Sequence, residues 1–356
     1  MSRRRADDSS GQPGGALAVG AGAGLAAERH VVGRTRLRPD PEADEPFFAL
    51  PADRTRAVLA DDGVPLHVEE DGPADAPLTV VFCHGYTQEL AVWHYQRKAF
   101  AADPSVRCVY WDQRSHGRSG RSPKEHSTID WLGRDLHAVL REVVPAGPVV
   151  LVGHSMGGMT VMALADRHPE LFGSRVVGVA LVGTSTGRLA EVSFGLPAAL
   201  TPVTRRVLPW LTRGMQRRPG VFERGRRLGT DLAFLIARHE AFGDDDVSPA
   251  LVEFVERMTA NTRIDVIAEF YDTFTAHDKL TALDVLRDVA TLVLVGSKDL
   301  ITPADHSEVI AKALPTAQLV VLEGAGHMVQ LERAEMVTLH LRALLRRAAR
   351  PVHRSA

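Results

Sequence analysis

Residues 149–165, near the middle of the chain, read VVLV-GHSMGG-MTVMALA. The apolar run predicts a strand and the last segment a helix, so that a G-x-S-x-G turn joins the two. A turn this tight leaves no room for neighbouring side chains, which explains the glycines on both sides of Ser155. Because the start of a helix favours negative charge, we predict that the Ser155 hydroxyl is a nucleophile.

Two later apolar runs end in residues that can activate a serine. Leu292-Val293-Leu294-Val295 leads to Asp299, and Leu319-Val320-Val321-Leu322 leads to His327. A serine hydroxyl needs a base that takes its proton and a carboxylate that orients this base. We therefore predict a catalytic triad of Ser155, Asp299 and His327, in which each residue follows a strand.

Other carboxylates fit this role less well. The predicted strand at residues 176–182 is followed by Gly183-Thr184-Ser185-Thr186, which contains no acid. Asp112 also follows a strand, but it precedes the serine and is predicted to pair with Arg114. Asp299 is therefore the expected acid of the triad.

With these motifs the chain resembles the α/β-hydrolase superfamily, over roughly residues 60 to 348. The resemblance rests also on residues 80–86, VVFCHGY, and residues 110–119, YWDQRSHGRS, where Ser115 replaces the commoner glycine. The order serine, aspartate, histidine is that of this superfamily. The resemblance implies an α/β fold with a mostly parallel eight-stranded sheet, flanking helices and a helical cap inserted after the sixth strand.

The resemblance also implies an oxyanion hole. Its donors would be the backbone N–H groups of Tyr86 and Met156, the latter being the residue after the nucleophile. Such donors stabilise the negative oxygen of a tetrahedral intermediate. Around them we expect a substrate pocket formed by His84, Gly85, Trp93, Trp210, Leu211 and Met215.

Three further histidines have less specific positions. We expect His154, inside the turn, to be structural, with its side chain pointing away from the substrate. His116 follows the fourth strand on a polar loop and is expected to be solvated. For His94, beside Trp93, a place in the pocket lining stays open.

The chain divides into five parts by composition and pattern. These are a Gly/Ala/Arg-rich extension (1–48), a first core part (49–185), a helical cap (186–276), a second core part (277–348) and a tail (349–356). The extension resembles a signal sequence, but Asp7 and Asp8 interrupt its basic start and its apolar part is short and rich in glycine and alanine. We expect a cytoplasmic protein, with membrane association or export through this segment as the alternative.

Composition agrees with a globular enzyme of 356 residues that are 45% hydrophobic. The formal net charge of −2 offers no electrostatic footprint for nucleic acid. Cys83 and Cys108 fall in neighbouring predicted core strands and imply no disulfide framework. No motif with metal-ligand spacing is present, and we expect neither a metal nor a cofactor. The oligomeric state stays open.

The parts together predict a serine hydrolase that cleaves a carboxylic ester of small to medium size through an acyl-enzyme. A carbon–carbon bond hydrolase or a cofactor-free perhydrolase would use the same triad, and a non-catalytic ligand-binding relative is a further alternative. Serine at the nucleophile position argues against the dehalogenases and epoxide hydrolases of this fold, which use aspartate. The cap carries many arginines, including Arg213, Arg217 and Arg218. They are either a solvated helical face or a site for an anionic substrate or lipid surface.

Overall fold

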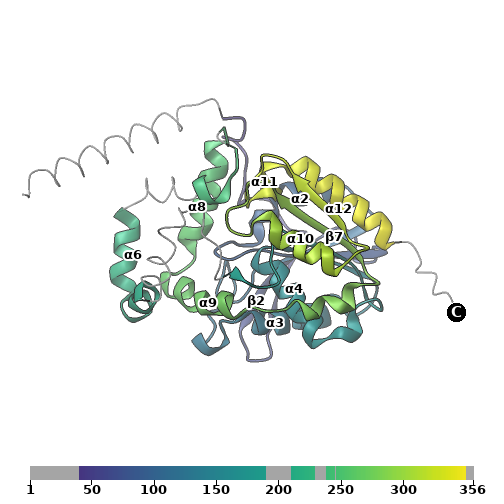
Figure 1. The fold of residues 1–356 in the computed structure, drawn as a ribbon, viewed down its shortest axis with the longest axis horizontal. Coiled ribbons are helices and arrows are strands. Elements are labelled where there is room, and N and C mark those ends of the chain that lie inside the picture. Colours follow the sequence, from purple (N-terminus) through teal and green to yellow (C-terminus); the bar gives the residue numbers. More distant parts are fainter. Residues whose placement is uncertain (1–39, 190–209, 229–237, 245, 350–356) are drawn as a thin grey trace, which may run out of the picture.

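The computed structural model describes residues 40–189, 210–228, 238–244 and 246–349. Its centre is an eight-stranded sheet in the order β1-β2-β4-β3-β5-β6-β7-β8 (Figure 1). The strands are β1 (Arg54–Leu59), β2 (Pro65–Asp71), β3 (Leu78–Cys83), β4 (Val106–Trp111), β5 (Val149–His154), β6 (Val176–Val182), β7 (Ala290–Gly296) and β8 (Gln318–Leu322). β2 pairs antiparallel with β1 and with β4, and the other strand pairs are parallel. The mostly parallel eight-stranded sheet is therefore confirmed.

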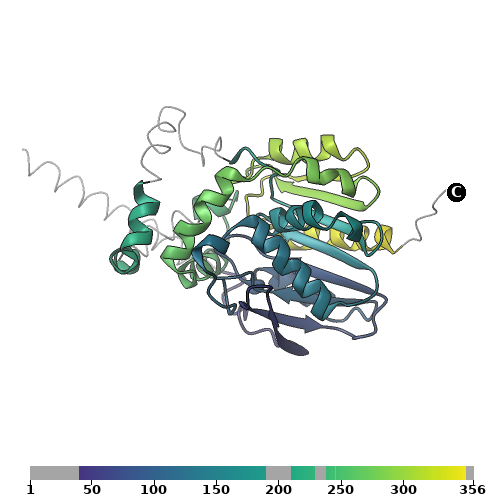
Figure 2. The ribbon, with the colours of Figure 1, turned by 90° about the horizontal axis from the view of Figure 1, so that it is seen from below.

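Helices cover both faces of this sheet, as Figure 2 shows. One face carries α2 (His94–Phe100), α11 (Val329–Glu332) and α12 (Ala334–Ala348), and the other carries α3 (Ile129–Val143), α4 (Met156–Arg167) and α10 (Ala304–Ala313). Short 3-10 helices lie at η1 (Leu90–Trp93), η2 (Lys124–His126), η3 (Pro169–Leu171) and η5 (Thr281–Leu286). Because both faces are covered, the central strands are apolar throughout rather than alternating with polar residues.

The cap follows β6 and lies beyond the end of the sheet at which the strands finish (Figure 1). Its described helices include residues 210–217, α6 (Pro219–Leu228), α8 (Pro249–Asn261) and α9 (Ile264–Ala276). Val266 and Phe270 of α9 join Met156 and Met159 of α4 in one buried apolar cluster. This cluster packs α9 against α4, the helix that begins directly after the predicted nucleophile. Residues 190–209, 229–237 and 245 of the predicted cap lie outside the described residues.

Residues 40–48, the end of the predicted N-terminal extension, pack against the folded core. The Phe47 ring stacks on Phe254 of α8 with centroids 4.5 Å apart. The Asp40 carboxylate accepts hydrogen bonds from the Ser248 hydroxyl at 2.6 Å and the Ala250 N–H at 2.8 Å. This segment therefore fixes the start of α8. Residues 1–39, with the possible signal or anchor, and residues 350–356 of the tail lie outside the described residues.

Cys83 and Cys108 are buried free thiols in the neighbouring strands β3 and β4, as expected. Burial raises the pKa of each thiol to about 12, so both stay protonated. Across the parts of the chain given above, no helix is both long and apolar enough to span a bilayer.

Candidate active site

Ser155 lies between β5 and α4 in a strained backbone conformation, with φ of +52° and ψ of −118°. The glycines on either side make this turn possible. A Cβ on Gly153 would lie 2.4 Å from the carbonyl oxygen of Gly157, and a Cβ on Gly157 would lie 2.1 Å from that of Cys83. Neither separation is compatible with a side chain, so the G-x-S-x-G spacing is required by close backbone packing.

Asp299 and His327 meet at the same edge of the sheet, after β7 and β8. His327 Nδ1 donates to Asp299 Oδ2 at 2.9 Å, and both side chains are buried. Asp299 Oδ1 accepts the N–H groups of Ile301 at 2.9 Å and Thr302 at 2.8 Å, while the Thr302 hydroxyl donates to Oδ2 at 2.9 Å. Burial raises the pKa of Asp299, but His327 and Thr302 outweigh this effect and hold the pKa below its ordinary value. Asp299 is therefore held ionised beside His327.

His154 links the serine turn to the histidine loop. Its Nε2 forms a 2.9 Å hydrogen bond with the carbonyl oxygen of His327, and the two rings lie 4.7 Å apart. Its Nδ1 lies 3.1 Å from Gln88 Oε1, which also accepts the N–H of Gly85 at 2.9 Å. Burial lowers the pKa of His154 to about 3, so the ring is neutral. His154 thus has a structural place, and it connects the three loops around Ser155.

The two expected oxyanion donors lie on adjoining segments. Tyr86 follows β3, and Met156 is the first residue of α4, where backbone N–H groups have no partner within the helix. The contact between Gly157 and the end of β3 brings these segments together. The Tyr86 hydroxyl donates to the carbonyl oxygen of Ile267 in α9, and its ring packs edge-on against Phe274. The side chain of Tyr86 therefore attaches this loop to the cap.

The comparison with protein families agrees with this geometry. The family described as having the alpha/beta hydrolase fold matches residues 79–334, which is most of the chain. The chain belongs to the α/β-hydrolase family.

Individual relatives are similar over most of their length. The chain is 27% identical over 266 residues to an sn-1-specific diacylglycerol lipase, ABHD11, of Mus musculus, covering 74% of this chain and 80% of the relative. It is 25% identical over 302 residues to 3-oxoadipate enol-lactonase 2 of Acinetobacter baylyi, covering 84% and 99%. A solved thermophilic esterase from Thermogutta terrifontis shares the fold with a TM-score of 0.64 and 24% identity, covering 83% of this chain and 100% of the esterase.

In this α/β-hydrolase, His84 and Gly85 support from within the loop that carries Tyr86, an expected oxyanion donor. His84 is buried, its Nδ1–H donates to the Gly85 carbonyl at 2.7 Å, and its Nε2 accepts the Gln113 N–H at 2.9 Å. Burial lowers the pKa of His84 to about 3, with a further contribution from His116. His84 therefore has a positioning role in place of the expected contact with substrate.

The other pocket candidates differ widely in exposure. Trp93 is fully buried in the core against Phe82, at 5.2 Å between ring centroids. Trp210 is 73% exposed and Leu211 is 44% exposed, because the opposite side of their helix faces the protein. Met215 lies on that inner side and is 8% exposed, so only this member of the cap set is buried.

Two expectations for the loop after β4 are wrong. His116 is buried rather than solvated, and its Nδ1–H donates to the Arg114 carbonyl at 2.9 Å. Asp112 does not pair with Arg114, whose guanidinium binds the carboxylates of Asp135 at 2.6 Å and Asp62 at 2.9 Å. Asp112 instead accepts backbone N–H groups, including that of Leu90 at 2.7 Å. Asp112 is therefore a structural residue of this loop. The carboxylate that binds His327 is that of Asp299.

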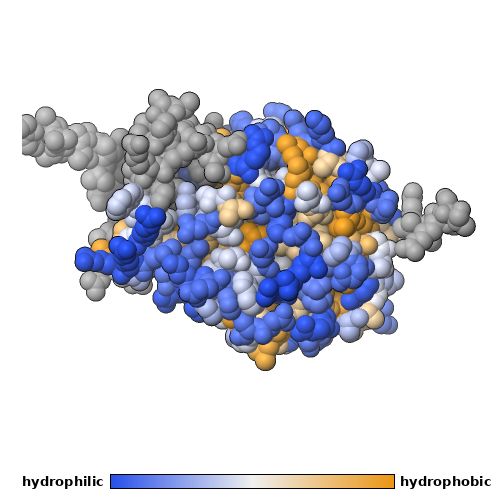
Figure 3. Space-filling model, turned by 60° about the horizontal axis from the view of Figure 1, so that its bottom comes forward, coloured by the Kyte–Doolittle hydropathy of each residue, from blue (hydrophilic) through white to orange (hydrophobic). Residues whose placement is uncertain are grey.

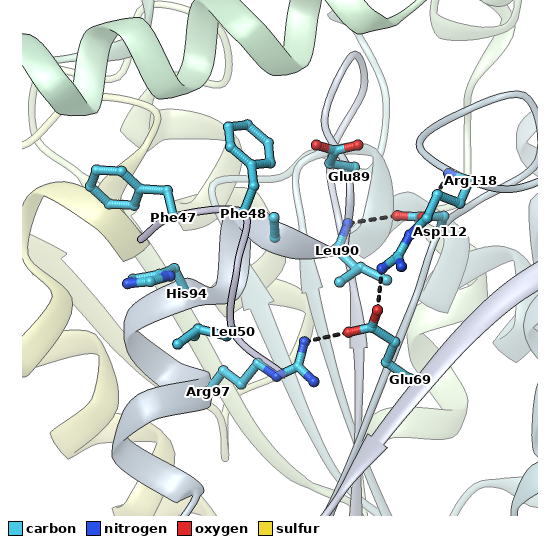
Figure 4. Close-up of a pocket in the computed structure, with 11 residues that line it drawn as sticks. Phe47, Phe48, Leu50, Glu69, Glu89, Leu90, His94, Arg97, Asp112 and Arg118 are labelled. Carbon is cyan, nitrogen blue, oxygen red and sulfur yellow. Dashed lines mark hydrogen bonds and ion pairs between the residues drawn. The ribbon is translucent and has the colours of Figure 1, made fainter. Parts of the chain in front are cut away.

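A cavity of about 290 Å³ lies beside this loop (Figure 4). Its walls combine aromatic and charged side chains, and they include none of the three predicted triad residues. The lining residues are Phe47, Phe48, Leu50, Glu69, Glu89, Leu90, Ala91, His94, Arg97, Asp112 and Arg118. His94 thus lines a cavity whose walls do not include Ser155, and its Nε2 binds Glu45 at 2.8 Å. Burial, with Asp112 nearby, raises the pKa of Glu89 to about 7.

Sequence reasoning missed the residues that hold the loops in register, among them Gln88, Thr302 and Glu332. The Glu332 carboxylate accepts the N–H of Gly326 at 2.8 Å, directly before His327, and that of Asp244 in the cap at 2.8 Å. Side-chain-to-backbone contacts of this kind join segments that lie far apart in sequence, so no local pattern indicates them. Among the described residues, no group of His, Cys, Asp or Glu is arranged to hold a metal ion.

Proposed function

We propose that this α/β-hydrolase is a serine esterase that cleaves carboxylic esters of small to medium size through an acyl-enzyme intermediate. The observation that carries the proposal is the buried Asp299–His327 pair at 2.9 Å, at the sheet edge where Ser155 occupies its strained turn. The names of the relatives, which include a lipase and a lactonase, support an enzyme that acts on ester bonds.

The first half of the reaction forms the acyl-enzyme. His327 Nε2 takes the proton of the Ser155 hydroxyl while its Nδ1–H stays bonded to Asp299, and the serine oxygen attacks the ester carbonyl. The N–H groups of Tyr86 and Met156 stabilise the resulting oxyanion, and each such donor typically lowers the barrier by about 3 kcal/mol. When the tetrahedral intermediate collapses, His327 gives its proton to the leaving alcohol.

The second half releases the acid by the same route. His327 takes a proton from water, which attacks the acyl carbonyl, and then returns this proton to the Ser155 oxygen. Asp299 stays ionised throughout, because its two oxygens are held by His327, Ile301 and Thr302. No co-reactant other than water is needed.

The buried apolar cluster between α4 and α9 supports an apolar acyl or aryl group as the part of the substrate next to the carbonyl. Met156 and Met159 contribute to it from α4, and Val266 and Phe270 contribute from α9. Apolar walls with a few polar groups near the reacting atom are typical of such pockets.

Labelling with a fluorophosphonate tests the nucleophile directly. We expect one covalent adduct at Ser155, no adduct in Ser155→Ala, and hydrolysis of p-nitrophenyl esters that varies with acyl length. A folded protein that is neither labelled nor active on the ester series would contradict the proposal and favour a non-catalytic ligand-binding protein. Labelling of Ser155 without ester turnover would favour carbon–carbon bond cleavage or perhydrolysis instead.

A further inference from the structure

The outer side of the cap combines exposed apolar and basic side chains. Trp210 is 73%, Leu211 44% and Val221 64% exposed, on the helix at residues 210–217 and on α6. Arg213, Arg217 and Arg218 lie between them in sequence and are also exposed. We call this set the Trp/Arg face: Trp210, Leu211, Arg213, Arg217, Arg218 and Val221. In Figure 3 the cap end of the molecule, on the left, is a largely hydrophilic surface that includes hydrophobic atoms.

The anchoring of this segment determines which side faces outward. At about 100° per residue, Thr212, Met215 and Gln216 share one side of the helix, and each is buried or half-buried. Gln216 Nε2 donates to the Ala268 carbonyl of α9 at 3.0 Å, which fixes the orientation of the helix. Trp210 is therefore directed outward, with Arg213 over its ring.

Two arginines of this face lack an acidic partner within the described part of the chain. Among the described residues, no carboxylate forms an ion pair with Arg217 or Arg218. The Arg213 guanidinium lies 6.0 Å from the centre of the Trp210 ring, in a cation–π arrangement. In the sequence from position 210 to position 223, Glu223 is the only acidic residue. The face therefore attracts anions while it keeps three large apolar side chains in water.

We propose that the Trp/Arg face binds the surface of a bilayer that contains anionic phospholipids. Tryptophan and aliphatic side chains next to arginines are the composition of segments that lie at a membrane interface. The apolar side chains gain free energy in the boundary between head groups and acyl chains, and the arginines gain it from the anionic head groups. A soluble polyanion would satisfy the arginines but would leave Trp210 and Val221 in water.

Helix α9 connects the helix that carries this face to the proposed active site. Gln216 of the outer helix contacts Ala268 of α9, and the neighbouring Ile267 accepts the hydroxyl of Tyr86 on the oxyanion loop. In Figure 1, α6 lies at the outer margin of the cap, with α9 between it and the sheet. Docking would therefore bring lipid esters to the cap, a consequence that rests on the proposed esterase function. Binding itself does not depend on that function.

Co-sedimentation of the full chain with vesicles tests the proposal. We expect binding to vesicles that contain phosphatidylglycerol, weak binding to pure phosphatidylcholine, and a decrease in binding as salt rises. Each arginine near an anionic surface contributes roughly a fivefold factor, so Arg217→Glu with Arg218→Glu should weaken binding about thirtyfold or more. Val221→Asp should also weaken it. Ser155→Ala should bind like the wild type, which separates docking from catalysis.

Two residues of α12 provide matched controls. Leu339 is 54% exposed, and Arg346 is exposed on the same helix, away from the cap. Leu339→Asp and Arg346→Glu should leave vesicle binding unchanged, and the face variants should hydrolyse soluble p-nitrophenyl acetate like the wild type. Equal binding to neutral and anionic vesicles, or equal losses in face and control variants, would overturn the proposal. Heparin serves as a soluble polyanion for comparison. If Val221→Asp bound both anionic vesicles and heparin as tightly as the wild type, the proposal would also be overturned, because the partner would then be recognised by charge alone.

Discussion

Ser155 has a positive φ, a conformation that residues with a side chain adopt only when their surroundings enforce it. The enforcing contacts are the short approaches at Gly153 and Gly157, together with the Ser155 N–H donating to the Val182 carbonyl at 2.9 Å. The hydroxyl itself contributes little to packing. The strain at Ser155 therefore comes from these backbone contacts. They stay in place when the hydroxyl is removed.

Ser155→Ala should accordingly abolish ester turnover while the protein stays folded. His327→Ala should be nearly as damaging, and the double variant should be no worse than either single variant, because the two residues act as a unit. In serine hydrolases such losses are on the order of a millionfold in kcat. Steady-state kinetics with circular dichroism check this prediction, and additive losses would mean that the two residues do not work together.

Thr302→Val tests how the acid is held, because valine keeps the shape of threonine and lacks the hydroxyl that donates to Asp299 Oδ2. A hydrogen bond to a charged group contributes about 1.5–3 kcal/mol, so kcat should fall about ten- to a hundredfold with little change in KM. In Asp299→Asn, kcat should fall much further, by about ten thousandfold. If kcat of Thr302→Val equalled that of the wild type, Thr302 would have no part in orienting the triad.

At the scale of elements, the site depends on how closely α4 approaches β3. A Cβ at position 157 would lie 2.1 Å from the Cys83 carbonyl oxygen, so any side chain there must separate the serine turn from the oxyanion loop. The same contact joins α4, which begins with Met156, to the end of β3, which leads to Tyr86. Element packing therefore decides whether the two oxyanion donors converge.

Gly157→Ala should thus lower both activity and stability, the latter by about 1–3 kcal/mol, because the backbone must shift to relieve the overlap. Gly220→Ala is the matched control, since a Cβ there meets nothing within 4 Å in helix α6. It should keep full activity and raise stability by up to about 1 kcal/mol. Urea unfolding and ester kinetics measure both effects, and a fully active Gly157→Ala would show that the close contact is not required.

At the scale of the whole molecule, three buried histidines connect stability to pH. Burial lowers the pKa of His84 and of His154 to about 3 and that of His116 to about 4. In the unfolded chain these groups take up protons near the ordinary histidine pKa of about 6.5. The unfolded state therefore binds more protons between these values, and this contribution to stability is present above pH 6.5 and is lost as the pH falls toward 4.

We therefore expect the free energy of unfolding, measured with urea, to decrease steadily from pH 6.5 to pH 4.5. Each of the three histidines contributes up to about 1.4 kcal/mol per pH unit in this range. His116→Asn should flatten the dependence by about one proton, because the asparagine amide can replace the Nδ1–H bond to the Arg114 carbonyl without titrating. An unchanged slope in this variant would mean that His116 is already protonated in the native protein.

The sequence by itself determined the fold class and proposed the triad, because both depend on local patterns. Apolar runs that end in a titratable residue predict buried parallel strands, and the glycines at 153 and 157 follow from the sterics of one turn. The mostly parallel eight-stranded sheet and its flanking helices were then expected from the resemblance to the family. The motifs that carry this resemblance are each formed by residues close together in the chain.

The tertiary structure alone decided which side chains are buried and what they contact. Trp93 and Trp210 are both aromatic residues expected in the pocket, yet one is in the core and the other is on the surface. His116 looked like a residue of a polar loop and is buried under the cap, beside Phe270. Gln88, Thr302 and Glu332 act on loops that they reach only in the folded chain. Burial and hydrogen bonding depend on distant segments, and the sequence around a residue does not specify these neighbours.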